Sequence, residues 1–330
     1  MQQRLLYLFT RTPLHVGAGS SVGAIDQPIQ RERHTGFPII PASSLKGSFA
    51  DHWNNSLDGP DEKGVRRRGA GEAAWLFGSD DARDEKAAAG ALLFGEARLL
   101  AFPIRSARGS YAWITSPLML RRAARDGVLA EKDIPAFPVD QAADAKALFS
   151  PEGPLALEVT EGTQKVKKVV LEEYAFSHLG SGDSKAAGAA LAGLFDDPVW
   201  KEVAARLVIL CDGQMSFFAT TACEVAQHVR INDETGTADP GALFNQENVP
   251  SEALFYAVTN ATDSRLKSKA YAGTDHTAKS AEAAMAIFEA KVENTKVFQF
   301  GGDASTGLGY CTVRVAKPAP VPATANSAAR

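Results

Sequence analysis

The chain has few cysteines and no long apolar run, and each of these shortages excludes a class of protein. The three cysteines, Cys211, Cys223 and Cys311, are odd in number and widely spaced. They form no Cys-x-x-Cys metal motif and are typical of a reducing compartment. No apolar run is long enough to cross a membrane, and no charged segment precedes a short apolar one. We therefore expect no membrane partner, no secretory leader and a cytoplasmic location.

The sequence also lacks the fingerprints of common enzyme classes. Gly17-x-Gly19-x-x-x-Gly23 imitates a dinucleotide site, but the prolines at positions 28 and 38 argue against the helix that such a site needs. Gly302-x-x-x-x-Gly307 imitates a P-loop, but Leu308 stands where the phosphate-binding lysine belongs. There is no His-Glu-x-x-His. These gaps disfavour a metabolic oxidoreductase, a kinase and a high-turnover nuclease.

The overall composition is that of an ordinary globular protein, with 45% hydrophobic and 22% charged residues over 330 positions. A net charge of −4 argues mildly against nucleic-acid binding, but the distribution of charge matters more than the sum. A protein that grips a polyanion on one face has clusters of positive charge, and so does an ordinary solvated surface. The clusters stand at Arg31/Arg33, Arg66–Arg68, Arg105/Arg108, Arg121–Arg125, Lys165–Lys168 and Arg265–Lys269.

The segment that follows the first expected strand carries polar residues that no core needs. Asp26 stands between apolar and proline residues where neither helix nor sheet is expected, so its carboxylate is free to reach a ligand. Arg31, Arg33 and His34 follow and are suited to positioning phosphate. His15 lies near the same loop, and either a role in proton transfer or a structural role fits it. We interpret the segment as a surface that holds a polyanion and sets one carboxylate against it.

Two further segments offer groups that bind phosphate. Ser44 and Lys46 lie at an expected helix N-terminus, where free N–H groups attract anions. The ordinary alternative is a capped helix with a solvated lysine. Near the other end of the chain lies a glycine loop that is either a tight bend or a backbone-contacting anion site. Its candidate contacts are Gly301, Gly302, Thr306, Gly307 and Gly309.

The order of the expected elements indicates an α+β protein. The patterns predict strands at 4–12, 91–105, 111–115, 155–160, 167–174, 206–211, 253–259, 296–300 and 310–315, and helices at 42–53, 72–77, 117–125, 213–227 and 279–293. This order fits a ferredoxin-like, RRM-like sheet with large insertions. Residues 229–250 are expected to form a projecting hairpin on which Leu243 and Phe244 point to opposite faces. The domain would span 1–315 and be followed by a disordered tail at 316–330.

Two of these motifs resemble the RAMP superfamily of CRISPR-associated proteins. The first runs from Gly23 to Pro38, with its Asp-Gln-Pro-Ile-Gln-Arg-Glu-Arg-His core, and continues in Ser44-Leu-Lys-Gly. The second is the loop Gly-Gly-Asp-Ala-Ser-Thr-Gly-Leu-Gly at 301–309. Within the superfamily, the chain is most similar to the repeated backbone subunit of the type III-B (Cmr) effector complex.

This resemblance implies a fold, a set of partners and an activity. The fold would be a ferredoxin-like palm with a thumb hairpin, in which Leu243 or Phe244 wedges beside a displaced base. The partners would be the CRISPR guide RNA, a single-stranded target RNA, copies of the chain in a helical filament and other Cmr subunits. Guide contacts would come from Arg31, Arg33, His34, Ser44 and Lys46 and from the glycine loop.

The resemblance also implies that the matching aspartate, Asp26, is needed to cut target RNA at regular intervals in antiviral defence. The neighbouring 2′-hydroxyl would be the nucleophile. Asp26 would hold a divalent cation, Mg²⁺ or Mn²⁺, or act as a general base. His15 would assist or be structural. The alternative is a RAMP scaffold that binds guide RNA without chemistry.

Overall fold

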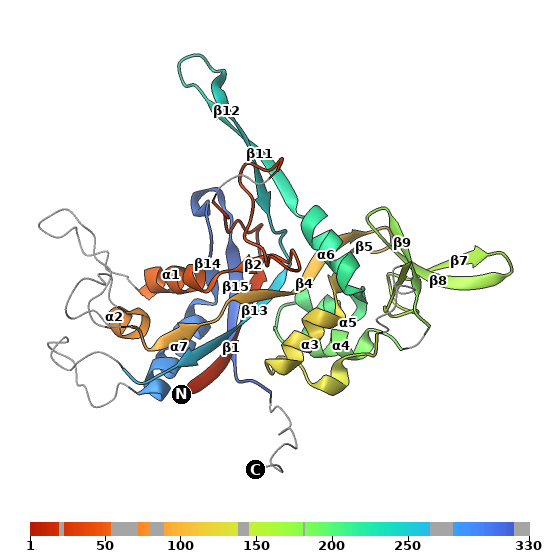
Figure 1. Cartoon of the computed structure of the whole chain (residues 1–330), viewed down its shortest axis with the longest axis horizontal. Coiled ribbons are helices and arrows are strands. Elements are labelled where there is room, and N and C mark those ends of the chain that lie inside the picture. The colour runs from red at the N-terminus through yellow and green to blue at the C-terminus, as the bar shows by residue number, and fades with distance from the viewer. Residues whose placement is uncertain are drawn as a thin grey trace, which may run out of the picture.

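The computed structural model describes residues 1–19, 23–53, 72–78, 89–137, 145–180, 182–264 and 280–319. It confirms a mixed α+β fold with one large sheet (Figure 1). The strands of this sheet are β1 (Gln2–Thr10), β2 (Ile39–Ile40), β3 (Leu92–Phe94), β4 (Ala97–Ser106), β5 (Ser110–Thr115), β6 (Lys146–Ala147), β7 (Leu157–Glu161), β8 (Gln164–Leu171), β9 (Tyr174–His178), β10 (Leu207–Ile209), β13 (Leu254–Ala261), β14 (Val297–Gln299) and β15 (Tyr310–Ala316).

Helices cover both faces of this sheet. They are α1 (Ala42–Trp53), α2 (Glu72–Phe77), α3 (Pro117–Arg125), α4 (Lys185–Ala192), α5 (Val203–Arg206), α6 (Asp212–Thr221) and α7 (Ala281–Thr295), with short 3₁₀ turns at Glu131–Asp133, Trp200–Glu202 and Ala304–Thr306. None of the helices described here is long and apolar enough to cross a membrane.

The first strand lies inside the sheet, with a partner on each side. β1 pairs antiparallel with β13 on one side and with β15 on the other, so that Tyr7 lies opposite both Tyr256 and Arg314. β13 pairs in turn with β4, and β15 pairs with β14. The resulting order is β14-β15-β1-β13-β4, which joins the two ends of the chain side by side.

β1 is buried on both faces. Alternate side chains of a strand point to opposite sides of a sheet, so this strand contributes to two cores. Leu6 and Leu8 enter one core, which also contains Phe49 of α1 and Phe288 of α7. Their neighbour Phe9 enters the second core, beneath the helices on the other face. A strand that feeds two cores has a nearly continuous apolar sequence, which is why it is evident from the sequence.

The end of one expected helix and the expected serine cap of another are wrong. The helix expected at 213–227 ends at Thr221, where the hydroxyls of Thr220 and Thr221 donate to Phe217 O and so compete with the backbone pattern of the last turn. α1 begins at Ala42 directly after a proline, so Ser44 lies inside its first turn and is not its cap.

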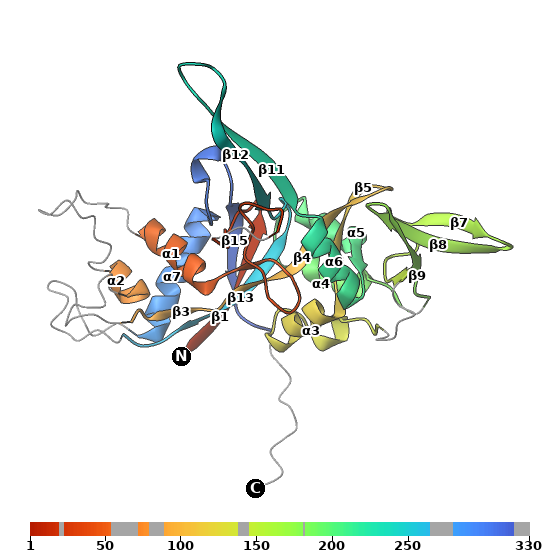
Figure 2. The same ribbon diagram turned by 45° about the horizontal axis from the view of Figure 1, so that its top comes forward.

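A two-stranded hairpin, β11 (Glu224–Ile231) and β12 (Ala238–Asn248), projects from the body (Figures 1 and 2). The expected hairpin is present, but its first strand begins five residues before position 229. The strands pair antiparallel, with a register shift between Val229 and Ile231. Leu243 is 67% exposed, whereas Phe244 is half-buried and stacks on His228 at 5.1 Å between ring centroids.

The expected tail and two of the basic clusters lie wholly or partly outside the residues that the structure describes. β15 continues to Ala316, and Ala319 N donates to Gly127 O at 2.8 Å, so the first residues of the expected tail are ordered against the body. Residues 320–330 lie outside the described residues, as do the basic clusters at 66–68 and 265–269.

Candidate functional site

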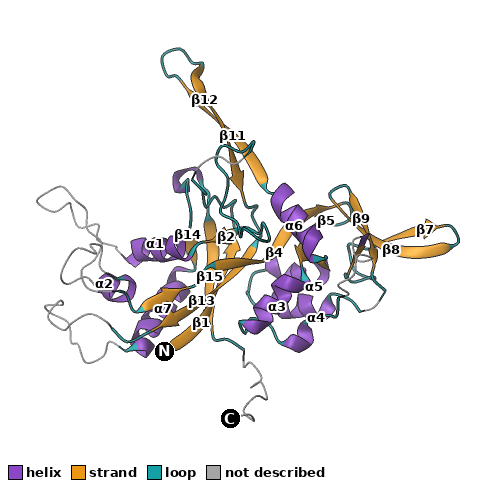
Figure 3. Ribbon diagram, in the orientation of Figure 1, coloured by secondary structure: helices purple, strands orange, loops and turns teal. Residues whose placement is uncertain are grey.

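The base of β12 connects the segments that the sequence singles out. Asn245 contacts the Asp26 loop, and Gln246 contacts the glycine loop. Glu247 contacts His15 through its backbone and the segment after Asp26 through its side chain. Figure 3 shows these loops gathered where the hairpin meets the sheet. One strand thus joins motifs from the two ends of the chain.

Asp26 is exposed, yet its position is fixed by Asn245. Asp26 N donates to Asn245 Oδ1 at 2.8 Å, and Asn245 N donates to Asp26 Oδ2 at 2.9 Å. Asn245 Nδ2 also donates to Ala24 O at 3.0 Å, and Gln27 N donates to Asn245 O at 3.1 Å. The loop is therefore docked along β12, and within the part of the chain that the structure describes Asp26 Oδ1 has no hydrogen-bond partner.

Glu247 forms a buried ion pair with Arg31. Its side chain is 9% exposed, and Oε1 lies 2.5 Å from Arg31 Nη2 while Oε2 accepts from Ile29 N at 3.1 Å. Arg31 also donates to Gly36 O at 2.6 Å and Ala219 O at 2.7 Å. The structure thus gives Arg31 internal acceptors. Its expected contact with phosphate stays a prediction that this arrangement does not favour.

His15 is buried below the hairpin base, with 8% of its surface exposed. Its Nδ1 lies 2.7 Å from Glu247 O, and because a carbonyl oxygen only accepts, Nδ1 carries the proton. In the neutral ring Nε2 is then an acceptor. A Cβ at Gly17 would lie 3.0 Å from that Nε2, so the loop passes directly over the ring.

The glycine loop makes two close backbone approaches, one to His15 and one to Phe300. Gly301 has φ +77°, and a Cβ there would lie 2.1 Å from His15 O. Gly309 has φ +79°, and a Cβ there would lie 1.9 Å from Phe300 O. Gly302 N donates to His15 O at 2.9 Å. These contacts show that at least part of the glycine content serves the tight bend.

The tip of the glycine loop is held by hydrogen bonds of its own. Asp303 Oδ2 accepts from Gln246 Nε2 at 2.6 Å, and Thr306 Oγ1 donates to Asp303 O at 2.9 Å. Gly307 has φ +89° and ends the 3₁₀ turn. The tip is exposed, so its outer surface is open to a ligand.

The remaining predicted cations lie at the surface. Arg33 and Lys46 are exposed, and among the residues described neither has a hydrogen-bond or ion-pair partner. His34 is exposed, and its Nε2 accepts from Arg122 Nη2 at 2.9 Å. Ser44 is half-buried in the first turn of α1. The positive groups that remain open to a polyanion here are therefore Arg33 and Lys46.

Glu32, which lies between Arg31 and Arg33, anchors this segment to α3. Burial acts to raise the pKa of Glu32, but hydrogen bonds from Thr35 and Arg122 and the charge of Arg122 outweigh it, so the pKa lies below its ordinary value. The bonds from Arg122 Nη1 to the two carboxylate oxygens measure 3.0 and 2.9 Å. Glu32 is therefore a structural anion that fixes the position of the backbone from which Arg33 and His34 extend.

The chain offers a metal ion few ligands. Across the described ranges, no three His, Cys, Asp or Glu side chains are grouped so that they could hold an ion. Asp26 is a single exposed carboxylate with one oxygen engaged by Asn245 N. Mg²⁺ is often bound by one or two carboxylates together with substrate phosphates and water, so one carboxylate fits an ion that arrives with RNA.

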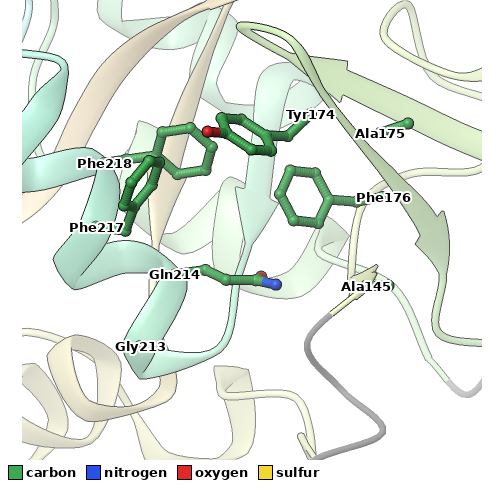
Figure 4. A pocket seen from close by; sticks show the side chains of 8 residues that line it. All are labelled: Ala145, Tyr174, Ala175, Phe176, Gly213, Gln214, Phe217 and Phe218. Atoms are coloured by element: carbon green, nitrogen blue, oxygen red, sulfur yellow. The ribbon is translucent and has the colours of Figure 1, made fainter.

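An aromatic pocket of about 540 Å³ lies between α6 and β9 (Figure 4). Tyr174 and Phe217 are 41% and 44% exposed and form its outer walls. None of the described residues that line it is charged. It shares no lining residue with the Asp26 site. The residues that line it are Ala145, Tyr174, Ala175, Phe176, Gly213, Gln214, Phe217 and Phe218.

Sequence reasoning missed Asn245, Gln246 and Glu247. The available signal was a run of polar residues inside a strand, between Phe244 and Val249. Gln246 and Glu247 are 1% and 7% exposed. Because buried polar side chains need hydrogen-bond partners, such a run indicates that the strand holds other segments.

The chain is an α+β protein whose hairpin base gathers two polar motifs, and comparison with known proteins identifies its family. The family model of the RAMP superfamily matches residues 8–312. The chain therefore belongs to the RAMP superfamily. It is 30% identical over 318 residues to the CRISPR system Cmr endoribonuclease Cmr4 of Pyrococcus furiosus, covering 95% of each chain.

Solved structures show the same fold. Oligomeric Cmr4 from P. furiosus superimposes with a TM-score of 0.61 at 27% identity, over 96% of this chain and 98% of that one. A chain of the type III-B Cmr-beta complex bound to cognate target RNA gives a TM-score of 0.63 at 19% identity, over 96% and 97%. At this lower identity the likeness shows the fold alone.

Proposed function

We propose that this chain is a guide-RNA-binding backbone subunit of a type III-B CRISPR effector complex and cleaves target RNA at regular intervals in antiviral defence. Similarity to the Cmr4 endoribonuclease over 95% of both chains supports the class. The observation that carries the activity is Asp26, an exposed carboxylate held by hydrogen bonds against the base of a projecting hairpin.

The finer fold assignment is part of this proposal. The order β15-β1-β13-β4, with all neighbours antiparallel, supports a ferredoxin-like palm. α1 lies in the chain between β1 and β4, and α7 lies between β13 and β15, as that topology requires. We assign residues 1–315 to one RAMP-type domain and the hairpin β11–β12 to its thumb.

The cleavage step uses the RNA's own 2′-hydroxyl as nucleophile: its oxygen attacks the adjacent phosphorus, the P–O5′ bond breaks, a 2′,3′-cyclic phosphate remains, and the leaving 5′-oxygen takes a proton from water. Asp26 accepts the 2′-hydroxyl proton, or would be the residue that holds a divalent cation, Mg²⁺ or Mn²⁺. Such a cation stabilises negative charge on the phosphate. His15, with Nδ1 bonded to Glu247 O, presents Nε2 as an acceptor and is a candidate second proton carrier.

RNA backbone contacts are assigned to the open groups of the surface. Arg33 and Lys46 are the exposed cations, and His34, Ser44 and the exposed tip of the glycine loop lie in the same two motifs. Copies of the chain would stack as a filament along the guide, together with other Cmr subunits. Oligomeric Cmr4 in P. furiosus supports self-association.

These assignments predict a salt-dependent affinity for RNA with little sequence preference. Removing one phosphate-binding cation should lower the slope of log Kd against log salt by about 0.7 for single-stranded RNA. The double variant Arg33→Ala/Lys46→Ala is expected to lower the slope by about 1.4 in filter-binding titrations over a salt series. Lys132→Ala/Lys146→Ala, which removes two lysines outside both motifs, is the matched control. Equal slopes for both double variants would contradict the assignment.

The hairpin tip is expected to set the spacing of the cuts. Residues 230–242 would be replaced by Asn-Gly, which joins the opposed positions 229 and 243 by a two-residue turn, and the expected wedge residues Leu243 and Phe244 would both be changed to Ser. This trim keeps Asn245, Gln246 and Glu247, and therefore keeps the Asp26 loop in place. We expect cleavage to continue but at irregular positions on a denaturing gel. Unchanged spacing would make the tip an ordinary loop.

The proposed function as a whole is tested by assembling the chain with its partner subunits and a guide RNA, then adding a labelled complementary target. Regularly spaced products support it. A complex that binds guide and target but yields no product would support the scaffold alternative. Absence of any RNA in or on the complex at low salt would contradict both.

A further inference from the structure

We infer that Asn245 is a positioning residue for Asp26, a role that rests on the proposed function. Asn245 is half-buried on β12 and lies on the inner side of the loop that carries the carboxylate. Its side-chain amide spans the loop, because Oδ1 accepts from Asp26 N at 2.8 Å while Nδ2 donates to Ala24 O at 3.0 Å. The two bonds use the two ends of one amide.

The chemistry of the side chain is specific to an amide of this length. The loop presents an N–H donor at Asp26 and a carbonyl acceptor at Ala24, and the side-chain amide of Asn offers a matching acceptor and donor on one planar group. The backbone N–H of Asn245 adds a third bond, to Asp26 Oδ2 at 2.9 Å. With Oδ2 engaged in this way, Oδ1 keeps its lone pairs free of any partner among the described residues.

The contact matters because Asp26 has little else to hold it. Asp26 is exposed and its segment forms no regular helix or strand, so the loop owes its geometry to β12. A catalytic group held loosely loses rate even when every reacting atom is present, since a misplacement of about 1 Å costs on the order of 100-fold. Asn245 touches no reacting atom and acts through Asp26.

The test compares two substitutions in the assembled, guide-loaded complex. Asn245→Ala removes both side-chain bonds but keeps the backbone N–H. Asn245→Asp keeps the size and the acceptor but turns a second acceptor toward Ala24 O. We expect each to lower the single-turnover cleavage rate by roughly 10- to 100-fold. Guide loading, target affinity and melting temperature should match the native complex. Asn294→Ala, an exposed position on α7, is the matched control and should cut at the native rate.

Two results would overturn the inference. Rates for both variants within about twofold of native would show that Asp26 needs no such support. A drop in rate that parallels weaker assembly or weaker target affinity would show a merely structural role. Failure of the proposed function looks different, because then the native complex fails to cut or Asp26→Asn leaves its cutting unchanged.

Discussion

Asp26→Asn is expected to abolish target-RNA cleavage while leaving guide binding and assembly intact. A general base or a charge-stabilising ligand contributes about 100- to 10,000-fold to a rate, and an amide supplies neither a base nor an anionic ligand. The fold should barely change, because the residue is exposed and the new Oδ1 can still accept from Asn245 N. Single-turnover cleavage by the assembled complex measures the effect.

Two controls identify the chemistry behind that loss. A chelator should stop cleavage by the native complex, and Mg²⁺ or Mn²⁺ should restore it. A target with deoxyribose at the cut position should bind but stay intact, because the 2′-hydroxyl nucleophile is missing. If Asp26→Asn cuts at the native rate in an assembled complex, Asp26 is not the catalytic residue and the scaffold alternative applies.

Glu247→Ala is expected to lower the free energy of unfolding by about 3 kcal/mol, because removing one partner of a buried ion pair leaves the other charge uncompensated. The side chains of Glu247 and Arg31 are 9% and 19% exposed, and Ile29 N loses its acceptor as well. The segment after Asp26 is released at the same time, so cleavage should fall too. Urea unfolding followed by circular dichroism measures the stability.

The matched control removes a carboxylate from a surface pair. Glu161 lies on β7, pairs with Lys168 and is 52% exposed. Surface pairs contribute about 0–1 kcal/mol, so Glu161→Ala should unfold near the native midpoint. Equal midpoints for the two variants would mean that the Glu247–Arg31 pair does not stabilise the site.

Local patterns made much of the fold predictable. Helices at 72–77 and 117–125 match the structure to the residue, because capping residues and prolines mark their ends. The boundary near Thr221 failed because Phe218, Ala222 and Val225 fit a helical face, whereas Val225, Val229 and Ile231 also alternate as in a strand. Only the pairing of β11 with β12 decides between the two interpretations.

The site was predictable in its parts but not in its assembly. Asp26 and the glycine loop stand out locally, since an exposed acid and clustered glycines have no use in a core. Arg31 looked like a phosphate ligand because its partner, Glu247, lies 216 residues away. A contact of that separation leaves no local pattern, so neither the ion pair nor the role of Asn245 was visible from sequence.

The position of β1 between β13 and β15 affects how the chain can fold during its synthesis. Its neighbours β13 and β15 come from the last third of the sequence, and Gly302 N bonds to His15 O. During synthesis β1 emerges long before its partners, so this part of the sheet cannot close until β15 has left the ribosome. Contacts this distant slow folding and leave apolar strands exposed meanwhile. If Asp26 is the catalytic residue that we propose, its site is complete only when β15 has docked beside β1.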